Sequence, residues 1–550
     1  MPQQTPQASR GRKPAGSRQS SSRSRAGSTL REQLTTPGGF AVIVEVVPWR
    51  GPLTGDAMTG ALEVADELAD DPRIGALSVT DNAGGHAMLS PQALGERFLA
   101  RGREVIVHVA CRDRSRLGLE SLGWELKSRG LTNVLAVTGD YPVEGYGGLS
   151  RAVFDVDSVG LLALLSALDL PAAAGSPPAP DASTAAGSPP APAFFLGAAV
   201  GNVKRFEREV MPQYAKLALK IRAGADFVIC QMGYDARKED ELLRYMRLRG
   251  IVRPAVANAY ILSAGVARTF HAGRIPGCVV TDELLALAER HAASPDRGRA
   301  FFLEFAAKQV AIARGLGFQG IYLSGHRRAE EIRKILDLDA SFGADDWKAF
   351  AREMSFGFPD GFYVFDPDPA SGLNSDQLNS AFIRTRTRRA RGVARLHAPL
   401  DYRMSRLVHD LVYTPGTPGF RLGTAAYERV ERLRLDGPLH ALEQAFKVPL
   451  YDCRDCGDCS LPDVAYLCPE SKCPKNQRNG PCGGSHDGIC EVDDRPCIWA
   501  LAYDRLKPWG GEDAMLRRPP VIQDNALRRT SAWANTYLGR DHFARRPTEE

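Results

Sequence analysis

The sequence predicts an α/β protein: a (β/α)8 TIM-type barrel followed by a C-terminal cysteine-rich metal-binding module. Three observations lead to this fold class. Short apolar runs with strand character alternate about eight times with amphipathic helical stretches, starting near residue 40. The alternation covers roughly 290 residues, a length that suits a closed parallel barrel. Beyond it, eight of the 11 cysteines fall between Cys453 and Cys497.

The expected strands are short and rich in Val, Ile, Leu and Ala, as strands buried on both faces are. Helix-length segments lie between most of them, such as 57–69, 91–101 and 205–223. A doubly wound open sheet is the structural alternative. The strands are expected at 41–47, 75–79, 104–109, 133–137, 194–200, 226–230, 253–257 and 320–323.

Composition divides the rest of the chain. Residues 1–36 are expected to form a disordered basic tail, and residues 37–335 the barrel. The barrel is interrupted at 171–193, where AAGSPPAP occurs twice without any aromatic residue, which predicts a disordered insertion. A C-terminal domain is expected at 336–510, with the cysteine-rich module at 450–500. The remaining residues, 511–550, are expected to be loosely ordered.

The charge distribution argues against a nucleic-acid partner. The net charge is +5, but seven basic side chains and no acidic one lie in residues 1–31, so the rest of the chain carries −2. A nearly neutral folded part gives no basic surface for nucleic acid. No apolar run approaches the roughly 20 residues of a membrane helix, and the basic tail lacks the apolar region of a secretory signal. We therefore expect a cytoplasmic protein.

Clustered cysteines in a reducing cytosol indicate metal binding rather than disulfides. Three thiolates at x2 spacing can wrap one soft metal centre, which a later cysteine completes. The spacing is compatible with an iron–sulfur cluster and with structural zinc, and eight thiols leave one or two centres open. The expected ligands are Cys453, Cys456, Cys459, Cys468, Cys473, Cys482, Cys490 and Cys497.

Polar side chains stand where several expected strands end, which is where a (β/α)8 barrel holds its chemistry. Glu45 lies inside the first apolar strand, and burial raises the pKa of a carboxyl group, as a general acid requires. A single buried Glu or His in a strand is more often a structural hydrogen-bonding group. Here several strand ends converge, with Thr80, Asp81, Asn82, His108, Cys111, Arg112, Asp113, Thr138, Asp140, Asn202, Cys230 and Gln231.

Five segments together resemble the methylenetetrahydrofolate reductase family over about 40–330. They are VEVVPWRG at 44–51, HVACRDR at 108–114, GLTNVLAVTGDYP at 130–142, KIRAGADFVICQ at 220–231 and RIPG at 274–277. The stretch from about 395 to 505 resembles the C-terminal domain of some bacterial reductases and the small partner subunit of acetogens. Its specific matches are CGDC, CPK, NGPCGG and CIW.

The resemblance implies flavin-dependent reduction of 5,10-methylenetetrahydrofolate to 5-methyltetrahydrofolate. Glu45 matches the general acid, and Asp140 matches an aspartate beside both flavin and pterin. Thr80, His108 and Lys220 match positions near the flavin, and Gln231 matches a substrate-binding glutamine. The implied cofactor is FAD, with FMN as the alternative, and the implied donor is NADH, NADPH or a ferredoxin. The cysteines of the partner subunit look like an electron relay to the flavin.

Three departures from the family pattern concern the phosphate or dinucleotide contacts. Thr138 replaces a frequent Arg, Cys230 replaces a Thr, and the 201–203 turn lacks the usual proline. Two other function classes stay open: a folate-dependent methyltransferase or demethylase that needs no flavin, and a non-catalytic scaffold that docks a redox partner. A folate substrate is expected, and a redox partner protein and a homo-oligomer are left open.

Overall fold

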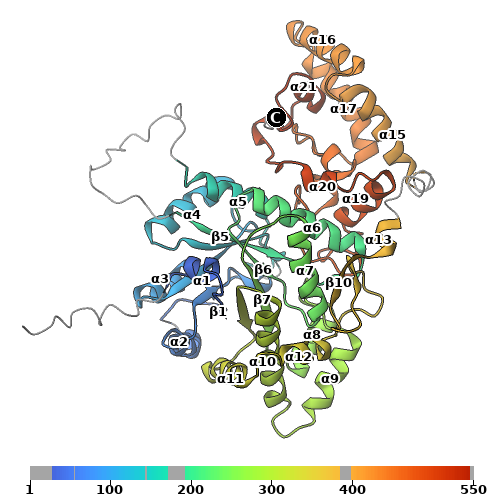
Figure 1. Ribbon diagram of the computed structural model, residues 1–550. Coiled ribbons are helices and arrows are strands. Elements are labelled where there is room, and N and C mark those ends of the chain that lie inside the picture. The colour runs from blue at the N-terminus through green and yellow to red at the C-terminus, as the bar shows by residue number, and fades with distance from the viewer. Residues whose placement is uncertain are drawn as a thin grey trace, which may run out of the picture.

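A closed barrel of eight parallel strands forms the centre of the molecule (Figure 1). The computed structural model describes residues 28–54, 56–142, 145–170, 193–384, 395 and 398–544. The strands pair in chain order, and the barrel closes where β1 pairs with β8. They are β1 (Ala41–Val46), β2 (Ala76–Val79), β3 (Glu104–Ala110), β4 (Asn133–Val137), β5 (Phe195–Val200), β6 (Phe227–Cys230), β7 (Ala255–Tyr260) and β8 (Gly320–Ser324).

The barrel prediction is confirmed, and all eight strands occur where the sequence predicts them to within a few residues. The doubly wound alternative is excluded because β1 and β8 are hydrogen-bonded to each other. Helices cover the outside of the barrel, and three of them separate β7 from β8. They are α2 (Asp56–Ala69), α3 (Pro91–Ala100), α4 (Arg116–Ser128), α5 (Ser158–Ala167), α6 (Glu207–Arg222), α7 (Ala236–Leu248), α8 (Ala264–His271), α9 (Asp282–Ala292), α10 (Arg299–Leu316) and α11 (Ala329–Ser341).

The first helix, α1 (Leu30–Thr35), closes the amino-terminal end of the barrel. Leu30 and Leu34 are buried in the inner core beside Ile43 and Ile106. The backbone N–H of Leu30 donates to Oε2 of Glu104 over 3.0 Å at the start of β3. The expected disordered tail at 1–36 is therefore corrected for residues 28–36, because two leucines bury there; residues 1–27 lie outside the described part.

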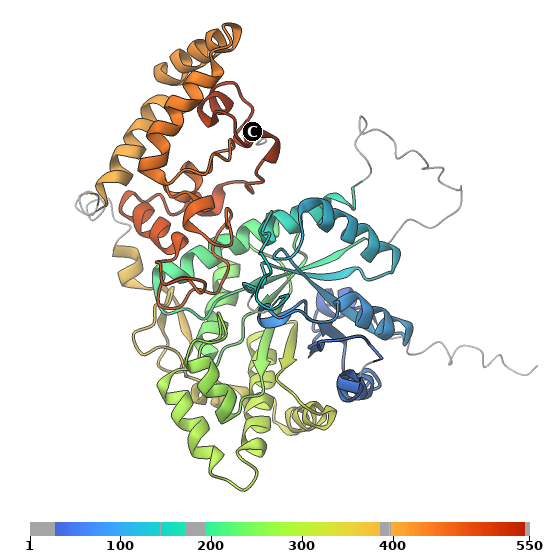
Figure 2. The same ribbon diagram turned by 180° about the vertical axis from the view of Figure 1, so that it is seen from behind.

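The C-terminal region packs beside the barrel as a helical arm and an irregular cysteine-rich module (Figure 2). A two-stranded antiparallel sheet, β9 (Phe365–Pro367) and β10 (Asn374–Leu378), lies against α7. The described helices are α12 (Trp347–Glu353), α13 (Ser380–Arg384), α15 (Leu400–Val408), α16 (Pro418–Arg432), α17 (Asp436–Tyr451), α18 (Pro469–Lys472), α19 (Ile498–Leu506), α20 (Ala514–Arg517) and α21 (Ala532–Tyr537).

Residues 511–544 differ from the loosely ordered tail that the sequence suggests. They contain α20 and α21 and bury Met515, Val521 and Tyr537. The apolar residues are too widely spaced to predict packing, because they dock onto distant segments rather than onto one another. Helix α20 packs on α6 of the barrel, and Tyr537 stacks on Tyr413 and Tyr427. The expected insertion lies outside the described residues apart from residue 193. Among the described helices, none has the length and apolar content needed to cross a bilayer.

Candidate active site at the barrel mouth and the cysteine module

Glu45 points into the barrel because side chains alternate along a strand, which sets it on the same face as Ala41 and Ile43. Burial raises the pKa of its carboxyl group to about 7, although a hydrogen bond from Tyr322 acts to lower it. The Tyr322 hydroxyl donates to Oε2 of Glu45 over 3.1 Å. A carboxyl group with this pKa can release a proton near neutral pH, as a general acid must.

His108 lies beside Glu45 in the same inward-facing layer. Its Nε2 is 2.9 Å from Oγ of Ser78 and 3.5 Å from the hydroxyl of Tyr322. Burial lowers the pKa of His108 to about 4, so its imidazole is neutral at physiological pH. The sequence identified His108 and Glu45 but missed Tyr322 and Ser78. Both side chains face the barrel interior from β8 and β2, and this orientation can be assigned only once the strand register is known.

Asp140 follows β4 at a sharp turn, where Gly139 adopts a φ of +88°. Oδ2 of Asp140 accepts the backbone N–H of Gly84 over 2.8 Å, and its carbonyl accepts Nη1 of buried Arg112 over 3.0 Å. These bonds tie the ends of β2, β3 and β4 together. Burial raises the pKa of the Cys278 thiol to about 12, and the negative charges of Asp140 and Glu45 add to this effect.

Thr80 and Lys220 have different surroundings. Thr80 is buried at the end of β2, and within the described residues its hydroxyl has no hydrogen-bond partner. Such an oxygen is free to bind a cofactor or substrate at the mouth. Lys220 instead lies between α6 and β5, where its ammonium donates to the carbonyl of Ala199 over 2.5 Å. Burial lowers the pKa of Lys220 to about 7.

Gln231 follows β6, and its Oε1 accepts the backbone N–H of Met232 over 3.0 Å. Its Nε2 approaches Gly277 of the RIPG segment so closely that a Cβ there would lie 2.9 Å away. The same Cβ would lie 3.1 Å from the carbonyl of Gly483 in the cysteine module. Glycine at 277 thus lets the barrel loop, Gln231 and the module meet.

A cavity of about 1050 Å³ opens beside Glu45 between β1, α2 and the end of β8. Its wall is apolar and aromatic at Trp49 and Tyr260 and cationic at Arg50 and Arg327. A flat conjugated ring with an anionic tail suits this lining. Its lining also includes half-buried His326, whose Nδ1 has no partner within the described chain and whose pKa is lowered to about 4 by desolvation.

The cysteine module covers the other side of the mouth. Nζ of Lys475 donates to the carbonyl of Gly139 over 2.8 Å and forms an ion pair with Glu491. Oε1 of Glu491 accepts the thiol of Cys482 over 3.2 Å. Lys475 therefore joins the turn before Asp140 to a cysteine of the module.

Two of the three departures from the family pattern lie beside contacts with the module. Thr138 is 3.4 Å from Oε1 of Gln477, which also accepts Nζ of Lys216 over 2.8 Å. Lys204, just after the 201–203 turn, donates to the carbonyl of Ser485. From the sequence, the substitutions at these positions put phosphate or dinucleotide contacts in doubt. In the fold, the cysteine module occupies the space next to them.

The electrostatic interactions among the eight thiols run within two sets of four. Burial is the first cause for every cysteine with a resolved shift. In addition to burial, the charges of Cys459 and Cys468 raise the pKa of Cys453 and Cys456. The outer set is Cys453, Cys456, Cys459 and Cys468, and the inner set is Cys473, Cys482, Cys490 and Cys497, linked in the same way.

Four thiolates are the donor set of a structural zinc ion or an iron–sulfur cluster, so the chemistry of each set fits such a group. In the described ranges, no three His, Cys, Asp or Glu side chains are already arranged as a metal-binding group. In this structure the thiols therefore do not stand at ligand positions. The grouping of Cys453, Cys456, Cys459 and one later cysteine as the principal metal site stays a prediction.

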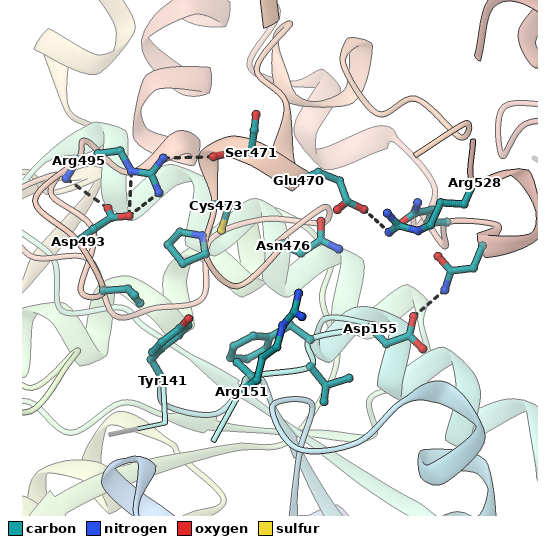
Figure 3. A pocket seen from close by; sticks show the side chains of 17 residues that line it. Tyr141, Arg151, Asp155, Glu470, Ser471, Cys473, Asn476, Asp493, Arg495 and Arg528 are labelled. Carbon is teal, nitrogen blue, oxygen red and sulfur yellow. Dashed lines mark hydrogen bonds and ion pairs between the residues drawn. The ribbon is translucent and has the colours of Figure 1, made fainter. Parts of the chain in front are cut away.

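A second cavity, of about 730 Å³, separates the barrel loop after β4 from the inner set (Figure 3). Tyr141 and Arg151 come from the barrel side, and Cys473, Arg495 and Arg528 from the module side. Two of its arginines are already paired, Arg495 with Asp493 and Arg528 with Glu470. Of the inner set, Cys473 lines this cavity.

Comparison with known proteins identifies the cysteine-rich segment. No curated protein matches the chain. One matching solved structure is an uncharacterized protein from Clostridium thermocellum, described as binding two copies of 5-methyl-5,6,7,8-tetrahydrofolic acid, with 13% identity over 55% of this chain and 94% of that one. Its TM-score of 0.36 does not establish a common fold. Residues 434–524 match the family model described as "Methylene-tetrahydrofolate reductase C terminal", and the matched segment contains all eight clustered cysteines.

Proposed function

We propose that the chain is a flavin-dependent, cytoplasmic oxidoreductase that reduces 5,10-methylenetetrahydrofolate to 5-methyltetrahydrofolate. The observation that carries the proposal is Glu45, a half-buried carboxyl group with a pKa of about 7, at the edge of a cavity of about 1050 Å³. The C-terminal segment supports the folate assignment, because its domain type accompanies this reductase.

Different side chains at the mouth have different roles in the proposed reaction. Glu45 holds the proton that the pterin nitrogen needs when the five-membered ring of the substrate opens to an iminium ion. Asp140 supplies a fixed negative charge that stabilises this cation. Gln231, held by Met232 and Gly277, is positioned to donate its amide to the substrate. The closing module keeps water from this side of the mouth.

A flavin, FAD or FMN, would supply the hydride when bound. The unpartnered hydroxyl of Thr80 and the side-chain carbonyl of Asn258, also unpartnered within the described chain, are buried atoms that fit polar groups of such a ring. His108, neutral because of its burial, would contact the ring without adding charge. We assign Lys220 a supporting role in the wall of β5, since its ammonium bonds to Ala199.

NADH, NADPH or a ferredoxin-like redox partner would supply the electrons. The two thiol sets would hold iron–sulfur clusters or zinc, with Cys473, Cys482, Cys490 and Cys497 next to the barrel. The chain's own contribution there is the contact of Lys475 with Glu491 and Gly139, which fixes the inner set against the mouth.

The test separates the two half-reactions in stopped-flow experiments. Glu45→Gln is expected to bind flavin and accept hydride from the donor at the wild-type rate but to lose folate reduction by about 10²–10⁴-fold. Glu63→Gln, an exposed acid on α2, is the matched control and should leave both rates unchanged. Equal loss in both half-reactions would remove Glu45 from the proton-donor role.

The visible spectrum of anaerobically purified protein separates the competing functions. A flavin spectrum supports the reductase, and a broad additional shoulder indicates iron–sulfur clusters. A colourless protein that binds folate would favour the methyltransferase or demethylase. A colourless protein without folate affinity would favour a scaffold for a redox partner.

A further inference from the structure

A buried lysine on helix α17 lies beside the outer set of thiols. Lys447 is 5% exposed, and its Nζ donates to Sγ of Cys459 over 3.7 Å. The same ammonium donates to Oε1 of Glu443 over 2.9 Å. A buried ammonium is costly unless its N–H groups reach acceptors. Lys447 has two, a carboxylate on its own helix and a sulfur of the outer set.

Glu443 fixes the position of this ammonium. Its side chain is completely buried, and Oε2 accepts the hydroxyl of Ser531 over 2.6 Å and the backbone N–H of Trp533 over 3.3 Å. These two donors stand at the start of α21. Because both oxygens of the carboxylate have partners, the ammonium of Lys447 is held between Glu443 and Cys459.

An ordinary ion pair of a helix would not be placed here. Glu443 and Lys447 are four residues apart on α17, a spacing whose pairs normally lie on the solvated side of a helix. Taking two charges out of water can cost more free energy than their attraction returns, unless further hydrogen bonds compensate. The sulfur of Cys459 provides such a bond for Lys447. The pair is therefore directed at the outer set.

The outer set has a second buried cation, Arg478, which is also 5% exposed. Its Nη1 donates to Oγ of Ser460 over 2.7 Å, and its Nη2 donates to Oε1 of Glu470 over 2.8 Å. Its Nε is buried and has no hydrogen-bond partner within the described residues. Burial acts to lower the pKa of this guanidinium, but the negative charges of Cys456 and Glu470 raise it above its usual range.

Buried cations at a thiol set match the charge of a metal–thiolate group. Four thiolates around a divalent zinc ion leave a net charge of about −2, and an iron–sulfur cluster held by four thiolates is likewise an anion. A buried anion needs cations or N–H donors around it. Lys447 and Arg478 meet this need, and the backbone N–H of Asp455 adds a donor to Sγ of Cys453 over 3.4 Å.

We propose that Lys447 and Arg478 are positioning residues of a metal centre at the outer set, where they balance the negative charge of the metal–thiolate group. Neither residue is a ligand, since Lys447 acts through Cys459 and Arg478 through Cys456. The inference rests on the part of the proposed function that assigns metal to the thiols, and it is independent of the reaction at the barrel mouth. Loss of such a partner typically lowers metal affinity by about 10–100-fold.

The experiment measures cobalt(II) binding to the full-length protein after metal removal and reduction under anaerobic conditions. All proteins carry Cys490→Ser, which leaves four thiols only in the outer set. The near-ultraviolet absorption of cobalt–thiolate bonds reports occupancy, and a competing chelator gives the affinity. Glu443→Gln/Lys447→Met is expected to bind cobalt about 10–100-fold more weakly. It removes both charges of the pair, so no unpaired charge stays buried.

Arg454→Met is the matched control. This residue lies between two cysteines of the outer set, but its side chain is 59% exposed and pairs with Asp452. The variant removes one positive charge from the same loop without touching a buried cation, so the cobalt affinity should stay unchanged. A fall in affinity equal to that of the double variant would assign the effect to net charge and overturn the proposal.

Arg478 is tested separately from Lys447. Arg478→Met is expected to weaken cobalt binding in the same range, and Arg478→Lys, which keeps the charge, to restore most of it. A purely structural role would not follow the charge in this way. Far-ultraviolet circular dichroism checks that each variant is folded, and if the double variant is not, Arg478→Met decides the question.

Unchanged cobalt affinity in both Glu443→Gln/Lys447→Met and Arg478→Met overturns the proposal. Loss of the fold in both would make the two residues structural supports of the module and would overturn it as well. If the Cys490→Ser protein itself takes up no cobalt, the metal assignment of the outer set fails, and this inference fails with it. Flavin binding and folate reduction by the wild type test the reductase separately.

Discussion

The hydroxyl of Tyr322 on β8 donates to Oε2 of Glu45 on β1 across the seam where the barrel closes, over 3.1 Å. The bond favours the ionised carboxylate, whereas burial favours the protonated acid and prevails, leaving the pKa of Glu45 at about 7. A hydroxyl on the last strand of the barrel therefore acts to lower the pKa of the acid on the first strand.

Tyr322→Phe removes this donor, so the pKa of Glu45 should rise further above its ordinary value. The acid then stays protonated to higher pH, and the alkaline limb of the folate half-reaction should move up by about one pH unit, the equivalent of one hydrogen bond. A pH profile of single-turnover folate reduction measures the shift. Movement of the limb to lower pH would show that Tyr322 does not act on Glu45 in this way.

Glu45→Gln should make the protein more stable at neutral and alkaline pH. The folded-state pKa of Glu45, about 7, lies above the ordinary 4.5, so the native chain holds a proton that the unfolded chain has lost. Wild-type stability therefore falls as pH rises from about 4.5 to about 7. Glutamine lacks this loss, and the gain above pH 7 should be at most roughly 3 kcal/mol. Melting temperatures of both proteins at pH 5 and pH 8 provide the check.

Asp140→Asn should raise the reduction potential of a bound flavin and slow folate reduction, because a negative charge near the ring and the substrate cation is removed. Asp140→Glu keeps the charge and is the control, expected to stay near the wild-type potential. A redox titration of the three proteins decides. An unchanged potential in Asp140→Asn would place the carboxylate away from the flavin.

His542→Ala should destabilise the C-terminal region without touching the barrel mouth. His542 is buried and lies between two buried carboxylates, with Nδ1 facing Asp458 and Nε2 at 2.8 Å from Asp463. Removing it takes a shared ion-pair partner from two buried carboxylates, and breaking a buried ion pair typically costs about 3–5 kcal/mol. Hydrogen exchange should show faster opening of residues 511–544, while β1–β8 keep their protection. Uniform loss of protection would mean that the two regions unfold together.

The sequence predicts the barrel and part of the site because both depend on local patterns. Apolar runs predict β1 to β8. A polar residue directly after such a run, such as Asp140, is predicted to lie at the mouth because the strands end there. Tyr322 and Ser78 could not be found this way, since tyrosine and serine in a strand carry no local sign of facing a catalytic acid. Their role follows from register, which is a property of paired strands.

The same limit applies to two further side-chain placements. Lys220 belongs to a recognisable segment, yet its side chain is directed to Ala199 of β5, because α6 packs it against the barrel wall. The packing of residues 511–544 depends on Asp458 and Asp463, some 80 positions earlier in the chain. No pattern within either segment contains that information.

The two thiol sets lead to the last prediction, which compares Cys456→Ser with Cys482→Ser. Cys456 belongs to the outer set, and its thiol donates to the carbonyl of Asp458 within the module. Cys482 belongs to the inner set, and its thiol donates to Glu491, which pairs with Lys475 at Gly139. If each set holds its own metal centre, each variant should lose one centre and keep the other.

The variants should differ in their effect on the barrel. Cys456→Ser is expected to keep flavin and the folate half-reaction, because the outer set has no hydrogen bond to the mouth among the described residues. Cys482→Ser is expected to weaken both, because it disturbs the contact that holds the module beside Asp140. Metal content by plasma emission, flavin content by absorbance and the two half-reaction rates are measured on the same preparations. Loss of all metal in either variant would show that the eight thiols form one centre. Equal effects of the two variants on flavin content and on the folate half-reaction would show that the inner set has no special influence on the barrel mouth.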